Sequence, residues 1–306
     1  MFHSSNYEPT IAPVHNGKTR GEIDRVQDMN ISTSLNRTRV KELGNADTVC
    51  WKDGIPSTNL TFRQYEYGAI ETFQKLACTA ATKIKWDDFK TTKVDVAVYL
   101  TDDTDTFKGT VWAKNLRLTG FGVNIGDPDA LIERNFTLVG EDYSIFQNSN
   151  KYIVYLQATA VSTSLTFTIG TGAYAAYEVP VMDPDHSGQY FLRCIRYRAS
   201  DGSNTEMVED TDFTYNSGTG QVSIATCVSG DVFTFVYSTG TYISGTNPFT
   251  VNTSDLCSIK ADECTILLAS GTTISKLQSV SFDVAFDRQD VKEIGDPDVV
   301  ATGSRD

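Results

Sequence analysis

The sequence contains no long apolar run, and its opening stretch carries no secretion signal. A helix that spans a bilayer needs about 20 consecutive apolar residues, and no stretch of this chain approaches that length. We therefore expect no membrane insertion. The opening stretch MFHSSNYEPTIAP lacks both the basic start and the apolar segment of a signal peptide, so we expect folding and assembly in the cytoplasm.

Histidine is scarce, and this scarcity argues against most hydrolase and zinc chemistry. Only three histidines are present, and a Ser-His-Asp triad would have to use His186 without the Gly-x-Ser-x-Gly string that presents such a serine. No cysteine or histidine pair has the spacing of zinc ligands. Residues 183–194 begin like a calcium loop, but Cys194 stands where the completing glutamate belongs. We predict no enzyme activity, no metal site and no cofactor.

The cysteines do not form a recognisable disulfide framework. All six are widely and irregularly spaced, which in a cytoplasmic protein favours free, mostly buried thiols. Whether Cys257 and Cys264 form a disulfide stays open at this point.

Positive charge is also in short supply, with 26 basic residues against 39 acidic ones and a formal net charge of −13. A protein that grips nucleic acid through its phosphates needs clustered lysine and arginine, so we expect no tight DNA binding. An acidic balance suits a surface past which DNA slides without sticking, although solubility alone explains it equally well.

What the sequence does contain is a β pattern. Residues 93–100 and 132–139 alternate apolar and polar side chains, as expected of strands buried on one side. The turn-forming string Gly-Asp-Pro-Asp at 126–129 joins the second of these strands to one at 110–124, which predicts a long hairpin. Helical spacing of apolar residues predicts one helix over 69–82.

The most informative feature is an internal repeat, in which residues 25–44 align without a gap to residues 276–295. Met29, Ile31 and Leu35 match apolar residues on the same face of the second copy, so the alternation itself is repeated. Both copies therefore predict a long strand that ends in a polar corner. The residues that recur unchanged are Gln27, Arg37, Val40, Lys41, Glu42 and Gly44, found again as Gln278, Arg288, Val291, Lys292, Glu293 and Gly295.

Three segments together resemble the tail tube (major tail) proteins of long-tailed bacteriophages. They are the strand and corner RVQDMNISTSLNRTRVKELGN at 25–45, its echo LQSVSFDVAFDRQDVKEIGD at 277–296, and the hairpin LRLTGFGVNIGDPDALIERNFTLVGED at 116–142. The hairpin closes in the string Val139-Gly140-Glu141-Asp142, which is similar to the end of a late hairpin in that family. The resemblance implies a mainly β fold: a β-sandwich or half-barrel with one flanking α-helix and a long hairpin that lines a channel. Such hairpins join those of neighbouring subunits into one barrel, which pairs otherwise exposed strand edges.

The sequence also predicts an organisation along the chain, which departs from a simple tube subunit in its middle section and in its incomplete second copy. We expect an N-terminal arm at 1–22 that orders only on assembly, and a tail tube domain at 23–158. A small immunoglobulin-like β-domain should occupy 159–248, where Thr, Ser and Gly are densest. Residues 249–306 should hold a partial second copy of the strand and corner.

The implied function is a structural virion protein of the tail, assembled in the host cytoplasm into stacked rings. Its expected partners are itself, with six chains per ring or alternatively three, the tape measure protein, and terminator and baseplate proteins. Contact with phage DNA in the lumen would be transient. By alternation, the predicted lumen-lining residues are Asn115, Arg117, Thr119, Glu133, Asn135 and Thr137. The predicted inter-subunit corner comprises Arg37, Val40, Lys41, Glu42 and Gly44 with Arg288, Val291, Lys292, Glu293 and Gly295.

An interpretation from another class is an adhesin or carbohydrate-binding β protein. Its ligand face would be the Gly- and Thr-rich middle section, where Tyr174, Tyr177 and Tyr190 could stack on sugars. This alternative explains neither the internal repeat nor the long hairpin.

Overall fold

The structure is a computed structural model, and its described part is mainly β, as the sequence predicted. No helix within that part is long and apolar enough to cross a bilayer. The described residues are 7–13, 21–23, 25–40, 50–66, 70–90, 92–101, 107–126, 129–150, 152–183, 185, 188–240, 260, 270, 279–286, 288–292 and 299–304.

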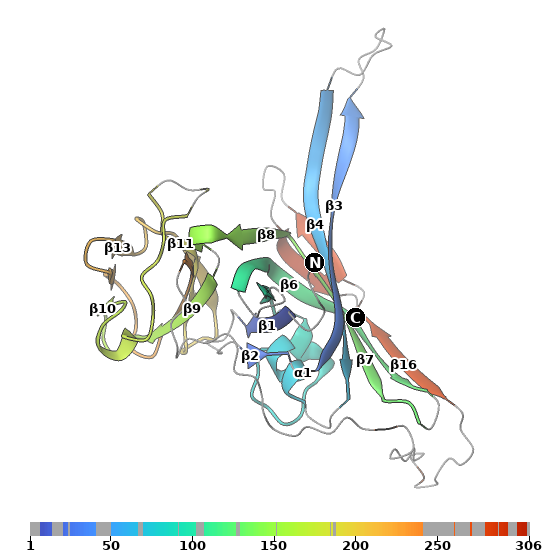
Figure 1. The fold of residues 1–306 in the computed structure, drawn as a ribbon. Helices are drawn as coiled ribbons and strands as arrows, with labels where there is room; N and C mark the ends of the chain where they lie inside the picture. The colour runs from blue at the N-terminus through green and yellow to red at the C-terminus, as the bar shows by residue number, and fades with distance from the viewer. Residues whose placement is uncertain are drawn as a thin grey trace.

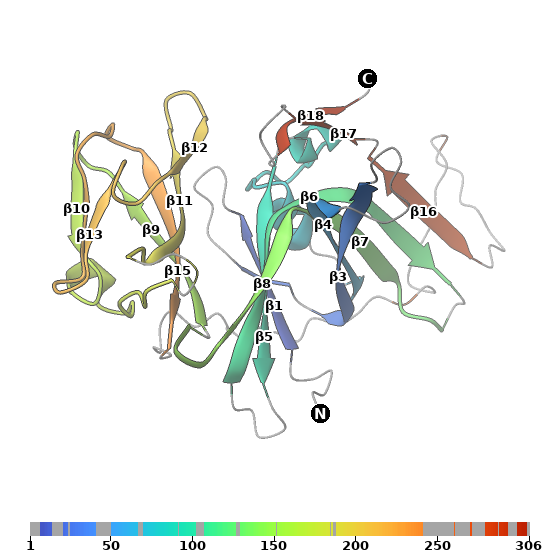
Figure 2. The same ribbon diagram turned by 90° about the horizontal axis from the view of Figure 1, so that it is seen from above.

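A nine-stranded sheet forms the body of the molecule (Figures 1 and 2). Its main path runs β2-β1-β5-β6-β7-β4-β3, and β8 and β16 both pair with β6. These strands are β1 (Tyr7–Pro13), β2 (Gly21–Glu22), β3 (Val26–Val40), β4 (Cys50–Tyr65), β5 (Val94–Thr101), β6 (Phe107–Ile125), β7 (Glu133–Gly140), β8 (Asp142–Gln147) and β16 (Val280–Ala285).

The long strand β6 divides this sheet into two halves. Residues 107–116 of β6 pair with β5, and 109–114 also pair with β8, whereas residues 117–125 pair with β7 and β16. We call β2, β1, β5, β8 and the first half of β6 the junction half-sheet. The amphipathic half-sheet consists of β16, the second half of β6, β7, β4 and β3. One strand, β6, therefore belongs to both halves of the sheet.

An irregularity at Asn115, which adopts a φ of 55°, lies just before the change of partner between Leu116 and Arg117. The Asn115 backbone N–H donates to Oδ1 of Asp95 (3.0 Å), and its side-chain amide donates to Oε2 of Glu141 (2.7 Å). Asparagine tolerates this left-handed conformation better than most residues. The bulge therefore lets β6 leave one half-sheet and enter the other.

The core of the body lies beneath the amphipathic half-sheet. Leu60, Phe62, Phe136 and Leu138 are almost fully buried, and the Phe62 and Phe136 rings stack with centroids 4.7 Å apart. The flanking helix α1 (Glu71–Leu76) and the 3₁₀ turn η2 (Trp86–Phe89) close this core on its other side.

The helix is shorter than the sequence predicted. It was expected over 69–82, but α1 ends at Leu76 because the chain turns through Ala77 and Cys78, and Cys78 adopts a φ of 50°. That left-handed residue stops helical hydrogen bonding. The alanine-rich tail of the apolar pattern therefore does not continue the helix, and tertiary context overrides propensity.

The N-terminal segment also differs from the expectation of an arm that orders only on assembly. Strand β1 pairs antiparallel with β5 along its whole length, from Tyr7 opposite Leu100 to Pro13 opposite Val94. The short β2 then pairs with β1. These parts of residues 1–22 therefore belong to the junction half-sheet, because β5 offers a free edge to pair.

Residues 152–239 form a separate two-sheet unit, which we call the small domain. One sheet has the order β12-β11-β15-β9 and the other the order β10-β14-β13. Strand β9, which the sequence assigned largely to the tube domain ending at 158, pairs along its length with β15 of the small domain. The strands are β9 (Tyr152–Thr159), β10 (Leu165–Thr168), β11 (Phe191–Tyr197), β12 (Asn204–Met207), β13 (Thr214–Asn216), β14 (Gln221–Ile224) and β15 (Val232–Thr239), with 3₁₀ turns η3 (Asn148–Asn150) and η4 (Gly172–Tyr174).

The second repeat copy is split between two elements. Its first part is β16, which pairs with β6, and its second part is β17 (Arg288–Lys292), which pairs with β18 (Val299–Ser304). Instead of the single long strand expected over this copy, β16 ends at Ala285 and a second strand, β17, begins at Arg288.

Candidate functional site

One face of the amphipathic half-sheet is polar across all five strands, and we call it the polar face. Strand register places the residues in rows: Asp28, Arg63, Asn135, Gly122 and Asp283 form one, and Asn30, Thr61, Thr137, Gly120 and Ala285 form the next. Two shorter rows flank them: Tyr65, Glu133, Asn124 and Ser281, and Ser32, Asn59, Val139 and Arg117.

The opposite face carries apolar side chains at the intervening positions. Its rows read Met29, Phe62, Phe136, Phe121 and Val284, and Ile31, Leu60, Leu138 and Leu118. Because successive side chains of a strand point to opposite faces, the alternation forces one face into the core and leaves the other polar.

A charge network joins three strands on the polar face. The Arg63 guanidinium contacts Oδ2 of Asp28 at 2.7 Å and Oε1 of Glu133 at 3.0 Å. The Asp28 carboxylate, followed by that of Glu133, raises the pKa of Arg63 above its ordinary value. With Asp283 and Arg117 also on this face, carboxylates outnumber guanidiniums, so the rows defined above carry no cluster of positive charge.

Glycines let β16 lie close to β6 on this face. A Cβ at Gly122 would collide with the carboxylate of Asp283, and one at Gly120 would stand 3.0 Å from the carbonyl oxygen of Val284. These two glycines therefore let an edge strand pair with β6 without steric conflict.

The predicted lumen-lining residues fall into two groups. Glu133, Asn135 and Thr137 lie on the polar face, and Arg117 shares the row of Val139. Thr119 lies at an irregularity between Leu118 and Gly120, and its hydroxyl donates to the carbonyl of Thr137 (3.1 Å).

Asn115 must be reassigned, because its side chain is bonded to Glu141 at the bend of β6 and its backbone to Asp95. Simple alternation through 115–119 fails since two irregularities interrupt the strand there. Sequence reasoning also missed the contribution of β3 and β4, although the alternation at 28–32 and 59–63 was a usable signal.

The hairpin of β3 and β4 extends beyond the rest of the sheet (Figure 1). Strand β4 pairs with β7 only from Thr58 to Tyr65, whereas β3 and β4 stay paired with each other out to Val40 and Cys50. Of the predicted corner residues, Arg37 and Val40 lie on this projecting part, and Arg288, Val291 and Lys292 lie in β17. Lys41, Glu42, Gly44, Glu293 and Gly295 lie outside the described residues.

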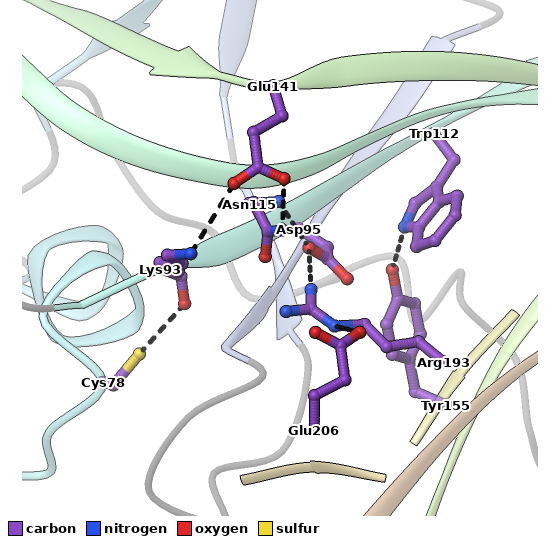
Figure 3. A network of polar contacts seen from close by, with 9 residues as sticks. All are labelled: Cys78, Lys93, Asp95, Trp112, Asn115, Glu141, Tyr155, Arg193 and Glu206. Atoms are coloured by element: carbon purple, nitrogen blue, oxygen red, sulfur yellow. Dashed lines mark hydrogen bonds and ion pairs between the residues drawn. The ribbon is translucent and has the colours of Figure 1, made fainter. Parts of the chain in front are cut away.

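The junction half-sheet carries a second polar network, where it meets the small domain (Figure 3). The buried Arg193 guanidinium contacts Asp95 at 3.3 Å and Glu206 at 3.1 Å. Burial raises the pKa of Asp95 and outweighs the opposing effects of the Arg193 cation and the Asn115 N–H. Burial likewise lowers the pKa of Lys93, which contacts Glu141 at 3.6 Å.

Two further hydrogen bonds and an apolar cluster hold the small domain against the body. The Tyr99 hydroxyl donates to the carbonyl of Ile153 (3.1 Å), and the Trp112 indole donates to the Tyr155 hydroxyl (2.9 Å). These residues belong to a cluster that spans both units and includes Val236. The network therefore joins the body to the small domain (Figure 3).

The other residues that the sequence suggested for ligand or metal binding are packed or buried within the small domain. Tyr174 packs on Phe167 (4.6 Å between centroids) and Tyr190 on Tyr215 (5.0 Å), so neither projects alone as a sugar platform. Cys194 is buried in β11, and burial raises the pKa of its thiol well above the ordinary value. Over the described residues, no group of three or more His, Cys, Asp or Glu side chains could hold a metal ion.

The thiols follow the sequence expectation where they are described. Cys78, Cys194 and Cys227 are buried thiols, and the Cys78 thiol donates to the carbonyl of Lys93 (3.8 Å). Cys257 and Cys264 lie outside the described residues, so their pairing stays an open question of the sequence.

No family model and no curated protein matches the chain. Solved structures that share part of its fold come from phage-like injection machines. A sheath-tube complex of the PVC extracellular contractile injection system has a TM-score of 0.31 and 18% identity, over 48% of this chain and 92% of the other. The anti-feeding prophage baseplate gives 0.34 and 14%, over 46% and 93%. The tube terminating cap of the same prophage gives 0.31 and 12%, over 48% and 91%. A likeness of this size assigns no function.

Proposed function

We propose that the chain is a structural subunit of a phage-type tail tube, and that it acts by self-assembly without catalysis. The observation that carries the proposal is the amphipathic half-sheet: one face buried, one face polar, and a long outer edge at β3 that no described strand pairs. An unpaired edge of this length is a template for another chain. Closing such sheets into a ring pairs every edge and turns the polar faces toward a common channel.

In this arrangement the polar face lines the lumen through which phage DNA leaves the particle. Its charges are mixed, with Arg63 neutralised by Asp28 and Glu133. Phosphates therefore meet no cluster of cations that would hold them. The lining set we propose is the polar face, with Glu133, Asn135 and Thr137 retained from the sequence and Asn115 left out.

The projecting hairpin of β3 and β4 contacts the next ring of the stack. It extends past the sheet where no described element of the same chain covers it, and the predicted corner residues Lys41, Glu42 and Gly44 follow β3 directly in the sequence. Six chains per ring is the arrangement we favour, with three as the alternative. The further partners we propose are the tape measure protein, the tail terminator and the baseplate, all within the virion tail assembled in the host cytoplasm.

The small domain, in this proposal, is an immunoglobulin-like decoration on the outside of the tube. It packs on the junction half-sheet through Ile153, Tyr155 and Val236, away from the rows of the polar face. Its position therefore leaves the lumen clear.

Sedimentation over a concentration series distinguishes this function from the adhesin alternative. A tube subunit forms species whose size grows with protein concentration, because closed rings stack on one another. A single small species at every concentration would contradict self-assembly and favour the adhesin.

A further inference from the structure

The two repeat copies occupy the two opposite edges of the same half-sheet. The order is β16-β6-β7-β4-β3, so the first copy (β3) forms one edge and the second copy (β16) the other. Figure 2 shows the two strands on either side of β4 and β7. Nothing in the alternation of a β sequence requires related strands to end at opposite edges.

The two strands also run in the same direction and present matching residues to the same face. Four successive antiparallel pairings connect them, and an even number of reversals restores the direction. By the repeat alignment, Asn30 corresponds to Ser281 and Ile31 to Phe282. Asn30 and Ser281 both lie on the polar face, and Ile31 and Phe282 both lie on the apolar face.

A displacement across four strands therefore carries β3 onto β16. Neighbouring subunits of a ring are related by the same kind of operation when each contributes β6, β7, β4 and β3 to a common barrel. In such a ring the β3 of the adjacent copy would lie antiparallel against β6, and β16 now holds that position.

The hold of β16 on this edge is limited. Its ladder with β6 covers Val280 to Ala285, whereas β3 pairs with β4 from Val26 to Val40. The Phe282 side chain is 53% exposed. Beyond the ladder, Phe286 donates its N–H to the carbonyl of Thr119 (2.8 Å) and contacts the Trp86 and Phe89 rings.

We propose that the β6 edge is the docking site for β3 of a second copy. Strand β16 occupies this site within a single chain and dissociates from β6 when two copies join. The inference rests on the proposed self-assembly and adds the identity of the paired strands. Before assembly β16 covers an edge that would otherwise aggregate. The longer β3 strand then replaces it through the same faces and the same direction.

An engineered disulfide tests the pairing directly. In the docked arrangement Asn30 of one copy takes the place of Ser281, which is opposite Asn124. Within one chain, β7 and β4 separate β6 from β3, a spacing of about 14 Å, which no disulfide can bridge. The full-length N30C/N124C variant, oxidised after assembly, should therefore yield a ladder of covalent oligomers on a non-reducing gel.

The control pair N30C/S281C reports the competing arrangement, in which β16 stays in place and meets β3 of the next copy. Each single-cysteine variant sets the background from the native thiols and gives dimers at most. A ladder from N30C/N124C and none from N30C/S281C supports the proposal. A ladder from N30C/S281C, or rings that give neither ladder, would overturn it. A wild-type chain that forms no rings would overturn the proposed function itself.

A second variant locks β16 onto β6 with a disulfide. Oxidised S281C/N124C ties β16 to β6 within one chain, and it should lose ring formation until a reductant restores it. Equal assembly of the oxidised and reduced forms would show that β16 stays on β6 in the ring and would overturn the exchange.

Discussion

The small domain and the amphipathic half-sheet are built from the same kind of strands, yet one is closed and the other is open. The small domain buries Phe235, Phe191 and Phe213 between its two sheets. Three of its four edge strands, β10, β12 and β13, have only three or four residues, and the fourth, β9, packs on the body. The half-sheet leaves one whole face polar and presents β3, a strand of 15 residues, as an edge. Short edges end a sheet, whereas a long edge invites another strand.

The two regions also differ in how they are anchored. The small domain is fixed by buried groups on both sides, including Asp95 with Arg193 and Tyr99 with Ile153. The projecting end of β3 and β4 is held only by its own hairpin ladder among the described strands. This contrast places stability at the junction and interaction at the edge.

The largest expected effect follows from breaking the junction at Arg193. Arg193→Met leaves the Asp95 carboxylate buried without its cation, and we expect a loss of about 3–5 kcal/mol in the free energy of unfolding. Denaturant titration measures it. The double variant D95N/R193M should recover much of the loss, because it removes both charges. Equal losses in the single and double variants would show that the charge pair is not the cause.

The stability that Arg193→Met loses relative to wild type should depend on pH. Burial raises the pKa of Asp95, so the folded chain favours the neutral acid. The stability that this neutral form contributes is present below the ordinary aspartate pKa of about 3.9 and is lost as pH rises toward the raised value. The deficit of R193M relative to wild type should therefore be smaller at pH 4 than at pH 7. A deficit that grows as pH falls would contradict this sign.

An intermediate effect tests the bend of β6. Asn115→Ala loses the charge-assisted bond to Glu141 and strains a residue with a φ of 55°, and we expect a cost of about 2–3 kcal/mol. Asn115→Gly loses the same bond without the strain and should cost less. If the alanine and glycine variants are equally stable, Asn115 has no role in shaping the bend.

The smallest effect on stability, within about 0.5 kcal/mol, is expected for lysines on the polar face. Asn135→Lys with Thr137→Lys adds cations to the lining while sparing Glu133, which pairs with Arg63. Tubes should assemble normally, and DNA ejection from particles that carry the variant should slow. Thr166→Lys, on an exposed position of the small domain, is the matched control. Ejection slowed equally by both substitutions would argue against a lumen role for the polar face.

The sequence predicted the parts of this fold that depend on local pattern. Alternation at 132–139 identified β7 and the polar side of Glu133, Asn135 and Thr137, because a strand buried on one side must alternate. The repeat identified two related strands. It could not reveal that they end at opposite edges of one sheet, since strand order is set by contacts far apart in the sequence.

Local irregularities caused the remaining errors. The bulge at Asn115 shifts the faces of β6. Its position depends on how β6 pairs with its neighbours in space, which the local residue pattern does not specify. The left-handed Cys78 ends α1 inside an alanine-rich stretch that favours helix. Strand β1 was missed as part of the sheet, because pairing with β5 gives it an order that its own sequence does not.

Electron microscopy of the purified wild-type chain at high concentration tests the central claim most directly. The account predicts hollow cylinders of stacked rings, with six subunits in each ring and the small domain on the outer surface. Threefold rings would keep the tube and change the number of chains per ring. Discrete particles that never polymerise would contradict the claim that the open edge of β3 is made to be paired by another copy.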